Sequence, residues 1–555
     1  MAKPTLRIVI VGGVAGGASA ATRARRMNEH AEIILFEKDE HVSFANCGLP
    51  YYIGGEIDDR KKLLVASREL LERRFRLDVR TRQEVRQIHR DSQSVTVFDH
   101  ATGETYQQQY DKLILSPGAA PLVPPIEGVD AANVFTLRNL ADTDRIVSAT
   151  ESSTTKKAVV VGAGFIGLEM VEQLVGRGFD VTLAELQSQV LPPLDAEMVQ
   201  PLEQELADRG VRLLLGDGIK RVVTDDAGVA TGVELQSGTT VDGDVVILGL
   251  GVRPNIRLAE DAGLEIGRGG GIATNAWMQT NDPHIYAVGD VAEYTFGPTG
   301  ESMRVALAGP ANRSGRLAGE HAATGSARRM PNVFGTAIVR VFEQTAAMTG
   351  LSIKLAKRLG KPVRSVTIVS NQHAGYYPGA TPLTLKLVYE PETGIVLGAQ
   401  AVGRDGVDKR IDVIATALAM KATVCDLAGL DLTYAPPFGA AKDPIHMAAF
   451  VACNQLDGVD DFVDADADLS GKQVVDVRTA GEVENKPLPA AEDVIHVPLD
   501  ELRERLVELD STIETVVSCG VGLRAHVGVR ILQQNGFTNV KNLSGGATLR
   551  YRAIK

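Results

Sequence analysis

The sequence predicts an α/β protein of several domains, and three observations support this fold class. The chain has 555 residues, which at roughly 150 residues per domain corresponds to three or four domains. Residues 7–37 and 158–185 repeat one pattern: an apolar strand, a glycine-rich loop, a helix and a second strand that ends in an acid. This βαβ pattern is typical of a parallel sheet. Residues 331–455 alternate strands with a helix, as in a separate α+β domain. Residues 470–555 are expected to form a last small α/β unit.

The composition excludes several classes of protein. The chain is 44% hydrophobic and 23% charged, which is typical of an ordinary globular protein. Its net charge of −12 argues against general nucleic-acid binding. An apolar run after Arg7 could be taken for a secretion signal, but glycines interrupt the helix that such a signal needs, and no apolar stretch reaches the ~18 residues that span a bilayer. We therefore expect no export, no membrane segment and a cytoplasmic location.

Cysteine is scarce in this chain. The four cysteines, Cys47, Cys425, Cys453 and Cys519, are too few for a disulfide scaffold and too widely spread for a zinc cluster. We expect no metal site and a reduced, intracellular setting. Cys425 and Cys453 lie in apolar helical sequences and are expected to be inert, which leaves Cys47 and Cys519 as the candidate reactive thiols.

The second glycine loop predicts a nicotinamide nucleotide site. Glycines at a strand–helix junction let the backbone approach a pyrophosphate, which the helix N-terminus stabilises. An acid at the end of the next strand can accept hydrogen bonds from a ribose diol. No arginine follows this acid to bind a 2′-phosphate, so the sequence favours NADH and leaves NADPH open. The predicted contacts are Gly162, Gly164, Gly167 and Glu185.

The first glycine loop departs from this pattern, because Val14 stands in place of the middle glycine. Two later segments resemble those of the flavoprotein disulfide reductases with two dinucleotide domains. Residues 280–290 resemble the flavin motif in which an aspartate, here Asp290, holds the ribityl chain, and residues 248–255 resemble the return segment between the nucleotide domains. The resemblance implies two Rossmann-like domains arranged as in glutathione reductase, with FAD bound by Gly12, Gly13, Gly16, Gly17 and Glu37.

The implied domains follow from the same resemblance. Residues 1–150 and 276–330 would bind FAD, and residues 151–275 would bind NADH. Residues 331–455 would form a dimerisation domain, which implies a homodimer in which this domain reaches the partner's active site.

The segment around Cys47 contains one cysteine where glutathione-reductase types have two, spaced C-x4-C. A single thiol must form a mixed disulfide with its substrate or cycle through a sulfenic acid. The segment is similar to that of single-cysteine flavoproteins, above all the coenzyme A-disulfide reductases and their rhodanese-fused relatives, the NADH-dependent persulfide reductases. Peroxidases and oxidases of this group carry a histidine where this chain has Ala15, so the sequence favours sulfur substrates.

The resemblance also implies a coenzyme A pocket. Ser19, Arg23 and Arg26 are spaced four and three residues apart, so they share one helix face and can bind phosphates; alternatively the arginines form a solvated helix face. A tyrosine of the dimerisation domain would donate its hydroxyl proton to a departing thiolate. The carried-over residues are Ser43, Asn46, Asn312 and Lys442 for binding, and Tyr434 with Tyr376 for catalysis, Tyr377 being an alternative to Tyr376.

The C-terminal part contains a C-x4-R loop between an apolar strand and a helix, from Cys519 to Arg524. Backbone N–H groups ahead of a helix lower the pKa of a cysteine and can hold an anionic persulfide. With Asp476–Arg478, this loop resembles that of a single-domain rhodanese, in which Arg524 would bind substrate. The usual Gly-His-Ile-Pro-Gly-Ala stretch is replaced around residues 485–491, and the aspartate-rich residues 456–469 are expected to be a solvated linker.

The sequence thus indicates an FAD-dependent NAD(P)H oxidoreductase that reduces the S–S bond of CoA persulfide or polysulfide through Cys47, with CoA as the substrate moiety. The rhodanese-like domain would relay sulfane sulfur through Cys519. Simple CoA-disulfide reduction, an NADH oxidase, and a flavin-based redox sensor or sulfur carrier remain as alternatives.

Overall fold

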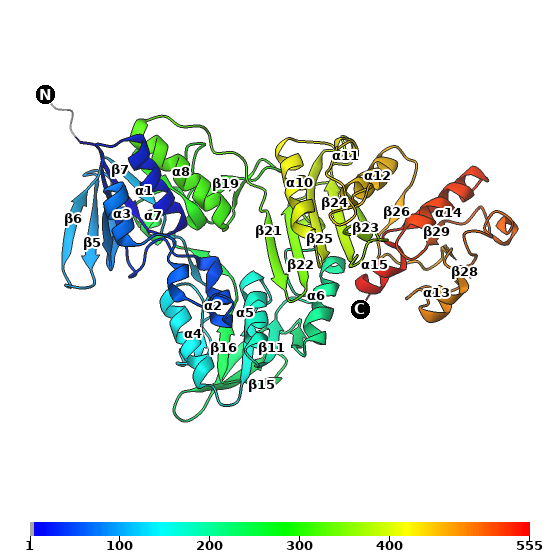
Figure 1. The fold of residues 1–555 in the computed structure, drawn as a ribbon, viewed down its shortest axis with the longest axis horizontal. Helices are drawn as coiled ribbons and strands as arrows, with labels where there is room; N and C mark the ends of the chain where they lie inside the picture. The colour runs from blue at the N-terminus through cyan, green and yellow to red at the C-terminus, as the bar shows by residue number, and fades with distance from the viewer. Residues whose placement is uncertain (1–4, 555) are drawn as a thin grey trace. The chain divides into compact units, whose positions relative to one another are not determined.

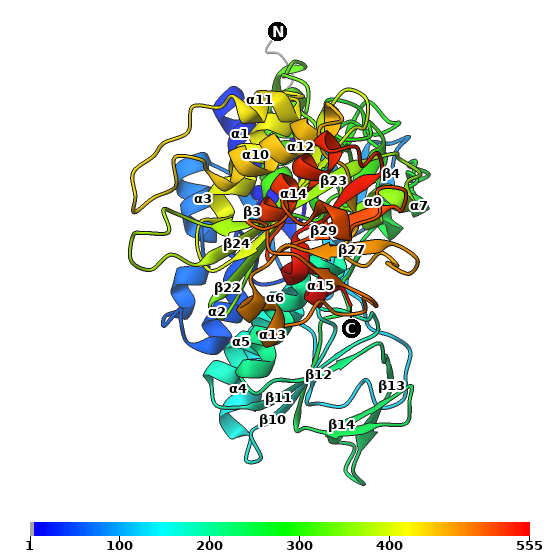
Figure 2. The same ribbon diagram turned by 90° about the vertical axis from the view of Figure 1, so that its right-hand side faces the viewer.

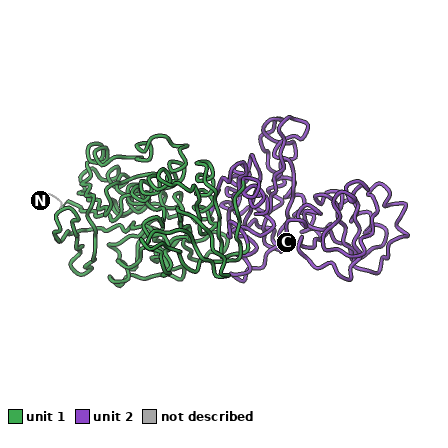
Figure 3. Tube along the Cα trace, turned by 90° about the horizontal axis from the view of Figure 1, so that it is seen from below, with its two compact units in different colours: residues 1–188, 210–335 green, residues 189–209, 336–555 purple. Residues whose placement is uncertain are grey.

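The computed structural model describes residues 5–554, which divide into two compact units (Figure 3). The first unit comprises residues 1–188 and 210–335, and the second comprises residues 189–209 and 336–555. Within the described residues, no helix is both long enough and apolar enough to cross a membrane.

A five-stranded parallel sheet of the first unit carries the first glycine loop (Figure 1). Its central strand is completely buried at Ile8, Val9 and Ile10, as expected for a parallel sheet that is covered on both faces. Helix α1 (Ala15–Met27) follows the loop and returns the chain to the neighbouring strand. Across the sheet the strands are β18 (Ile285–Ala287), β7 (Lys112–Leu115), β1 (Arg7–Val11), β2 (Glu32–Glu37) and β3 (Asp78–Thr81).

Helix α8 (Ala308–Thr324) packs closely against α1 because glycines lie at their contact. A Cβ atom at Gly315 would lie 2.1 Å from the carbonyl oxygen of Gly16, and one at Gly319 would lie 2.2 Å from that of Ala20. Only glycine lets the two backbones approach this closely. Smaller elements complete this part: η1 (Asn46–Gly48), α2 (Leu49–Gly54), η2 (Arg60–Leu63), α3 (Arg68–Phe75), α7 (Arg257–Asp261), η3 (Gly289–Val291), the antiparallel strands β4 (Gln83–His89), β5 (Ser94–Asp99) and β6 (Thr105–Gln109), and the hairpin of β19 (Glu293–Thr295) and β20 (Ser302–Arg304).

A second five-stranded parallel sheet carries the second glycine loop and repeats the arrangement of the first. Helix α5 (Phe165–Gly176) follows its central strand, as α1 does in the first copy. In order the strands are β12 (Arg212–Leu215), β11 (Asp180–Glu185), β10 (Lys157–Val161), β16 (Val245–Leu248) and β9 (Val134–Phe135). The first unit also contains α4 (Leu140–Ser152), the antiparallel strands β13 (Ile219–Thr224), β14 (Ala230–Leu235) and β15 (Thr240–Asp242), and the antiparallel pair β8 (Ala119–Pro121) and β17 (Val252–Pro254).

The second unit begins with an antiparallel sheet to which one helix comes from far away in the sequence. Helix α6 (Ala196–Asp208) lies within the segment 151–275 that was predicted to bind NADH, but residues 189–209 group with the second unit. The reason is a buried ion-pair cluster in which the Lys386 ammonium lies 2.8 Å from Asp195 and 2.5 Å from Glu197. The strands, in order, are β21 (Ala337–Val341), β22 (Gln344–Gly350), β25 (Val396–Gly403), β24 (Pro382–Tyr389) and β23 (Arg364–Asn371), and the helices are α9 (Ile353–Arg358), α10 (Val407–Ala419), α11 (Val424–Ala428) and α12 (Pro444–Leu456).

The C-terminal part of the second unit is built on a five-stranded parallel sheet. Figure 2 shows it from the right-hand side of Figure 1. Val474, Val516 and Val517 are fully buried in its central strands. In order the strands are β26 (Phe462–Val463), β30 (Val540–Leu543), β29 (Thr515–Ser518), β27 (Gln473–Asp476) and β28 (Ile495–His496), and the helices are α13 (Ala480–Asn485), η4 (Leu506–Glu508), α14 (Leu523–Gln534) and α15 (Gly546–Ala553).

The aspartate-rich segment 456–469 differs from the solvated linker expected for it. Its strand β26 forms the edge of the C-terminal sheet by pairing with β30. Asp460 is 2% exposed, lies 2.7 Å from Nδ1 of His526 and accepts a hydrogen bond from Asn542. Arg550 donates to the backbone carbonyls of Ala465 and Ala467. Polar partners on β30, α14 and α15 therefore hold this segment in place despite its many aspartates.

Candidate active site and sulfur-transfer site

The two glycine loops are built in the same way. A Cβ atom at Gly17 would lie 1.8 Å from the carbonyl oxygen of Gly12, and one at Gly167 would lie 1.9 Å from that of Gly162. The first glycine of each loop has a positive φ, 94° at Gly12 and 102° at Gly162, a conformation that favours glycine. These four positions are required by the turn itself, before any nucleotide is considered.

The acids at the strand ends accept hydrogen bonds from the backbone of the two glycine loops. The Glu37 carboxylate accepts a hydrogen bond of 2.8 Å from the Gly13 N–H, and the Glu185 carboxylate accepts one of 2.6 Å from the Ala163 N–H. Both acids are buried, and burial raises the pKa of Glu37. Each carboxylate keeps further acceptor capacity, as a ribose diol requires.

The helix N-termini after the loops fit dinucleotide pyrophosphates. No side chain caps α1 at Val14 or α5 at Gly164, so the first N–H groups of both helices need an acceptor. A Cβ atom at Gly164 would meet no atom within 4 Å, which shows that this glycine borders open space. The residues present therefore fit FAD at the first loop and NAD(P)H at the second.

Cys47 lies in η1, between the first glycine loop and α2. The preceding Ser43 adopts a positive φ of 49° and donates its N–H to the carbonyl oxygen of Gly13 at 2.8 Å. The segment that carries the thiol is therefore attached to the first loop. The residue is exposed, yet partial desolvation of its thiol, followed by the charges of Glu169 and Asp290, raises the pKa of Cys47.

Two predicted residues near Cys47 have unusual surroundings. Asn46 has a buried oxygen without a partner, and Asp290 has a raised pKa. The Asn46 amide donates to the carbonyl oxygen of Arg138 at 3.2 Å, whereas its own carbonyl oxygen is buried without a hydrogen-bond partner. Burial raises the pKa of Asp290, and the nearby charges of Arg138 and Arg304 oppose this effect. A ligand with hydrogen-bond donors would satisfy Asn46.

The predicted phosphate-binding face of α1 meets α8. The Ser19 hydroxyl donates to the Asn312 amide oxygen at 2.6 Å, so two predicted residues far apart in sequence are adjacent. Arg23 forms an ion pair of 2.5 Å with Glu320. Burial, then the charges of Arg316 and Arg23, lower the pKa of Arg26. The sequence interpretation missed Arg316, although it lies one helical turn after Asn312 on α8.

In the second unit, two exposed tyrosines face each other. The hydroxyl oxygens of Tyr376 and Tyr434 are 3.0 Å apart, and this hydrogen bond raises the pKa of Tyr376. Tyr377 instead packs its ring edge-to-face against His373. The geometry therefore pairs Tyr376, rather than Tyr377, with Tyr434. The predicted residue Lys442, eight positions after Tyr434, is exposed.

A buried arginine, which the sequence interpretation missed, joins the two loops that carry these tyrosines. Arg410 is 1% exposed; it donates to the Gln372 carbonyl oxygen at 2.7 Å and forms an ion pair of 2.7 Å with Asp443. The Ala374 N–H also donates to the carbonyl oxygen of Gly439 at 2.9 Å. No local sequence pattern marks Arg410, because its partners are contributed by both loops.

Cys519 directly follows β29 and begins the loop before α14. Its sulfur accepts a hydrogen bond of 3.1 Å from the Gly522 N–H, and the residue is only 1% exposed. The loop is held by α15: the Ala547 and Thr548 N–H groups donate to the carbonyl oxygens of Cys519 and Gly520. Backbone N–H groups directed at the sulfur can hold an anionic persulfide.

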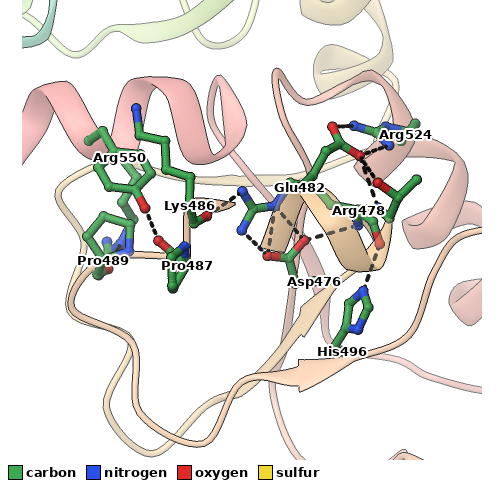
Figure 4. A network of polar contacts seen from close by, with 11 residues as sticks. Asp476, Arg478, Glu482, Lys486, Pro487, Pro489, His496, Arg524 and Arg550 are labelled. Carbon is green, nitrogen blue, oxygen red and sulfur yellow. Dashed lines mark hydrogen bonds and ion pairs between the residues drawn. The ribbon is translucent and has the colours of Figure 1, made fainter. Parts of the chain in front are cut away.

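Arg524, in the first turn of α14, is paired with a carboxylate of α13 (Figure 4). Its guanidinium donates two hydrogen bonds, of 2.8 and 2.6 Å, to Glu482, and Arg524 lowers the pKa of Glu482 to about 2. Behind this pair, Arg478 forms a buried ion pair of 2.6 Å with Asp476. The replaced stretch 485–491 is held by Arg550, which donates to the carbonyl oxygens of Pro489 and Ala490. The sequence interpretation missed Glu482, which follows the recognised Asp476–Arg478 motif by four residues.

Comparison with known proteins defines the class. Residues 6–315 match the model of the pyridine nucleotide-disulphide oxidoreductases, residues 336–444 match the dimerisation domain of that family, and residues 461–549 match the rhodanese-like domain. The chain belongs to the pyridine nucleotide-disulphide oxidoreductase family and is an FAD- and NAD(P)H-dependent oxidoreductase. The predicted fold class and its rhodanese-like domain are confirmed.

Particular relatives are similar over most of the chain. A coenzyme A disulfide reductase of Staphylococcus aureus (strain JH9) is 37% identical over 446 residues, which are 80% of this chain and 99% of the relative. Reduced CoADR-RHD of Bacillus anthracis has a TM-score of 0.94 with 44% identity, covering 100% of this chain and 99% of that one. A NAD-dependent persulfide reductase from A. fulgidus has a TM-score of 0.90 with 38% identity, covering 98% of this chain and 100% of that one.

Proposed function

We propose that this enzyme uses NADH to reduce the S–S bond of CoA persulfide or a related sulfane-sulfur compound through Cys47, and that Cys519 relays sulfane sulfur. One observation carries the proposal: a single-cysteine flavoprotein segment and a rhodanese-type cysteine loop occur in one chain, each without a second cysteine in its motif. A thiol without a resolving partner must exchange sulfur with an external molecule.

The residues suggest the following steps. The Cys47 sulfur attacks the S–S bond of the persulfide, which forms a mixed disulfide with CoA and releases hydrosulfide, or a Cys47 persulfide and free CoA thiol. FAD held at the first glycine loop, near Glu37 and the N-terminus of α1, would supply the transfer of two electrons from NADH that reduces the S–S bond at Cys47. This reduction restores the Cys47 thiol and releases CoA thiol from the mixed disulfide, or hydrosulfide from the persulfide. Ser19, Arg23 and Arg26 bind the phosphates of CoA, with Ser43, Asn46, Asn312 and Lys442 completing the pocket. Arg524 binds the donor that loads Cys519.

The tyrosine pair supplies the proton that a departing thiolate needs. We assign this role to Tyr434, with Tyr376 as its hydrogen-bond partner. The assignment requires a homodimer in which the dimerisation domain of one chain serves the Cys47 site of its partner. The scarcity of cysteine and the need for free thiols agree with a cytoplasmic location.

CoA-disulfide reduction is the second candidate, and a specific observation favours it. The Staphylococcus aureus relative with that name matches along 99% of its own length but only 80% of this chain. The flavoprotein part therefore does not need a rhodanese-like domain for that reaction in the relative. A NADH oxidase is disfavoured by Ala15, which occupies the position of the peroxide-chemistry histidine, and steady turnover of NADH with a persulfide would argue against a redox sensor.

One experiment separates these functions. NADH consumption is measured with CoA persulfide, CoA disulfide, polysulfide and oxygen for the wild type, Cys47→Ser, Cys519→Ser and the control Cys425→Ser. We expect Cys47→Ser to lose turnover with every sulfur substrate and Cys519→Ser to lose it with polysulfide alone. Full activity of Cys47→Ser would refute the mechanism, and an unaffected Cys519→Ser would favour the CoA-disulfide reductase.

A further inference from the structure

Two cysteines outside the proposed mechanism face each other in the second unit. The sulfur atoms of Cys425 on α11 and Cys453 on α12 are 3.0 Å apart, although the sequence predicted both to be inert. Both are free thiols, Cys425 being exposed and Cys453 half-buried. Helices α11 and α12 pack directly against each other. The packing of these two helices therefore places the two thiols next to each other.

The environments of the two thiols differ, and the difference assigns their order of reaction. Burial, the hydrogen bond with Cys425 and the charge of Asp457 raise the pKa of Cys453 to about 12, so this thiol stays protonated at neutral pH. Cys425 faces solvent and is open to attack a small oxidant. Thiol–disulfide exchange depends on such access, so Cys425 is the first to react and Cys453 is the resolving thiol.

We propose that Cys425 and Cys453 form a reversible redox site, which closes into an intrachain disulfide when the enzyme meets a low-molecular-weight disulfide. This inference does not depend on the proposed function, because neither cysteine belongs to the Cys47 or the Cys519 site.

The reaction balances as two exchanges. The Cys425 sulfur attacks a disulfide RSSR, forms the mixed disulfide Cys425–S–SR and releases one RSH. Formation of the mixed disulfide removes the Cys425 thiol that helps to raise the pKa of Cys453. The Cys453 thiol then loses its proton and attacks the Cys425 sulfur; the departing thiolate takes up a proton as the second RSH, and the Cys425–Cys453 bond forms. Two protein thiols are thereby oxidised and one external disulfide is reduced to two thiols, so that no further oxidant is needed.

The bond would restrain the segment that carries predicted site residues. The chain between the two cysteines contains the connection from α11 to α12, and with it Tyr434 and Lys442. Cross-linking the two ends of a chain segment reduces the conformations open to it. We therefore expect slower hydrogen–deuterium exchange in residues 429–443 of the oxidised protein than in the reduced protein.

Oxidised glutathione is the probe for this site. The reduced FAD-loaded protein is incubated with it, remaining thiols are blocked, and peptides are analysed by mass spectrometry without reduction. In the wild type we expect a linked Cys425–Cys453 peptide that dithiothreitol cleaves. In Cys453→Ser we expect a stable glutathione adduct on Cys425, and in Cys425→Ser we expect Cys453 to stay free. Both variants should keep the NADH turnover of the reduced wild type.

Three results would overturn the proposal. The first is a wild type in which Cys425 carries glutathione but no linked peptide forms. The second is a Cys425 that stays unmodified in the wild type and in Cys453→Ser alike. The third is a bond between two subunits, seen as a cross-linked dimer on a non-reducing gel. A failure of the proposed function would appear separately, as absent turnover, because the thiol measurement needs no substrate reduction.

Discussion

At the scale of single residues, the charges that act most on Cys47 among the described residues are those of carboxylates. Desolvation and two carboxylates, Glu169 and Asp290, raise its pKa, so the thiol form predominates at neutral pH. Attack of Cys47 on an S–S bond therefore requires loss of this proton, because the thiolate is the nucleophile.

The exchange Glu169→Gln tests this electrostatic account. It removes one negative charge near Cys47 and keeps an amide oxygen that can still accept the hydrogen bond from Tyr51. We expect the pKa of Cys47 to fall, and alkylation at neutral pH to become about three- to tenfold faster. The measurement is the rate of iodoacetamide labelling against pH by peptide mass spectrometry, with Cys425 as the reference in the same sample. An unchanged profile would contradict the assignment.

Glu482 is the carboxylate that pairs with Arg524 next to the Cys519 loop. Its pKa is lowered from 4.5 to about 2, so the carboxylate stabilises the folded state at pH values above 4.5. That contribution is lost as the pH falls from about 4.5 towards 2. In this range the unfolded chain binds a proton at Glu482, whereas the folded protein does so only near pH 2. Between pH 5 and 8 the pair with Arg524 stays intact.

We predict that Glu482→Gln slows sulfur transfer through Cys519 by about tenfold, since Arg524 loses its charged anchor. Transfer from thiosulfate to cyanide measures this step without NADH. Glu484→Gln, on the exposed side of the same helix, is the matched control and should behave as the wild type. Equal rates for Glu482→Gln and the control would show that Arg524 needs no positioning.

At the scale of elements, the two glycine loops separate what the turn requires from what the nucleotide requires. Gly167 lies against the Gly162 carbonyl oxygen, whereas Gly164 borders open space. The glycine motif therefore contains a structural position and a ligand position in a single turn.

This separation predicts opposite effects of two similar exchanges. We expect Gly164→Ala to keep the stability of the fold within about 1 kcal/mol but to raise the KM for NADH at least about tenfold, because the methyl group occupies space for the pyrophosphate. Gly167→Ala should instead lower the thermal midpoint, since its Cβ would lie 1.9 Å from the Gly162 oxygen. KM, flavin content and the thermal midpoint are measured together. A Gly164→Ala enzyme with an unchanged KM would contradict this placement of NADH.

At the scale of the whole molecule, the segment 456–469 shows how composition can mislead. Its aspartates predict a solvated linker, yet Asp460 is buried between His526 and Asn542. We expect Asp460→Ala to lower the free energy of unfolding of the C-terminal part by about 1–3 kcal/mol, because the buried Asn542 amide loses an acceptor. Hydrogen–deuterium exchange of β26 and α14 in the full chain measures this change. Asp464→Ala, at an exposed position of the same segment, should leave it unaltered.

The sequence predicted the parts of the fold that local pattern specifies. Both βαβ units, their acids and the C-x4-R loop follow from residue spacing within about 30 residues, which is the range of a single βαβ motif. The parts it missed depend on partners that are distant in sequence. Lys386 draws residues 189–209 into the second unit, Arg410 joins two loops, and Cys425 meets Cys453 across two helices. The roles of the predicted site residues remain predictions, which the variants above address.

The hydrogen bond between each loop and its acid constrains the design of altered coenzyme use. If Glu185 binds the ribose diol as predicted, an engineer who wants an enzyme that prefers NADPH would replace it with a residue that tolerates a 2′-phosphate. The same carboxylate, however, accepts the N–H of Ala163 and so supports the loop that receives the pyrophosphate. A change of coenzyme at this position therefore requires a replacement acceptor for that N–H, and a redesign that treats Glu185 only as a specificity residue would weaken the binding of both coenzymes.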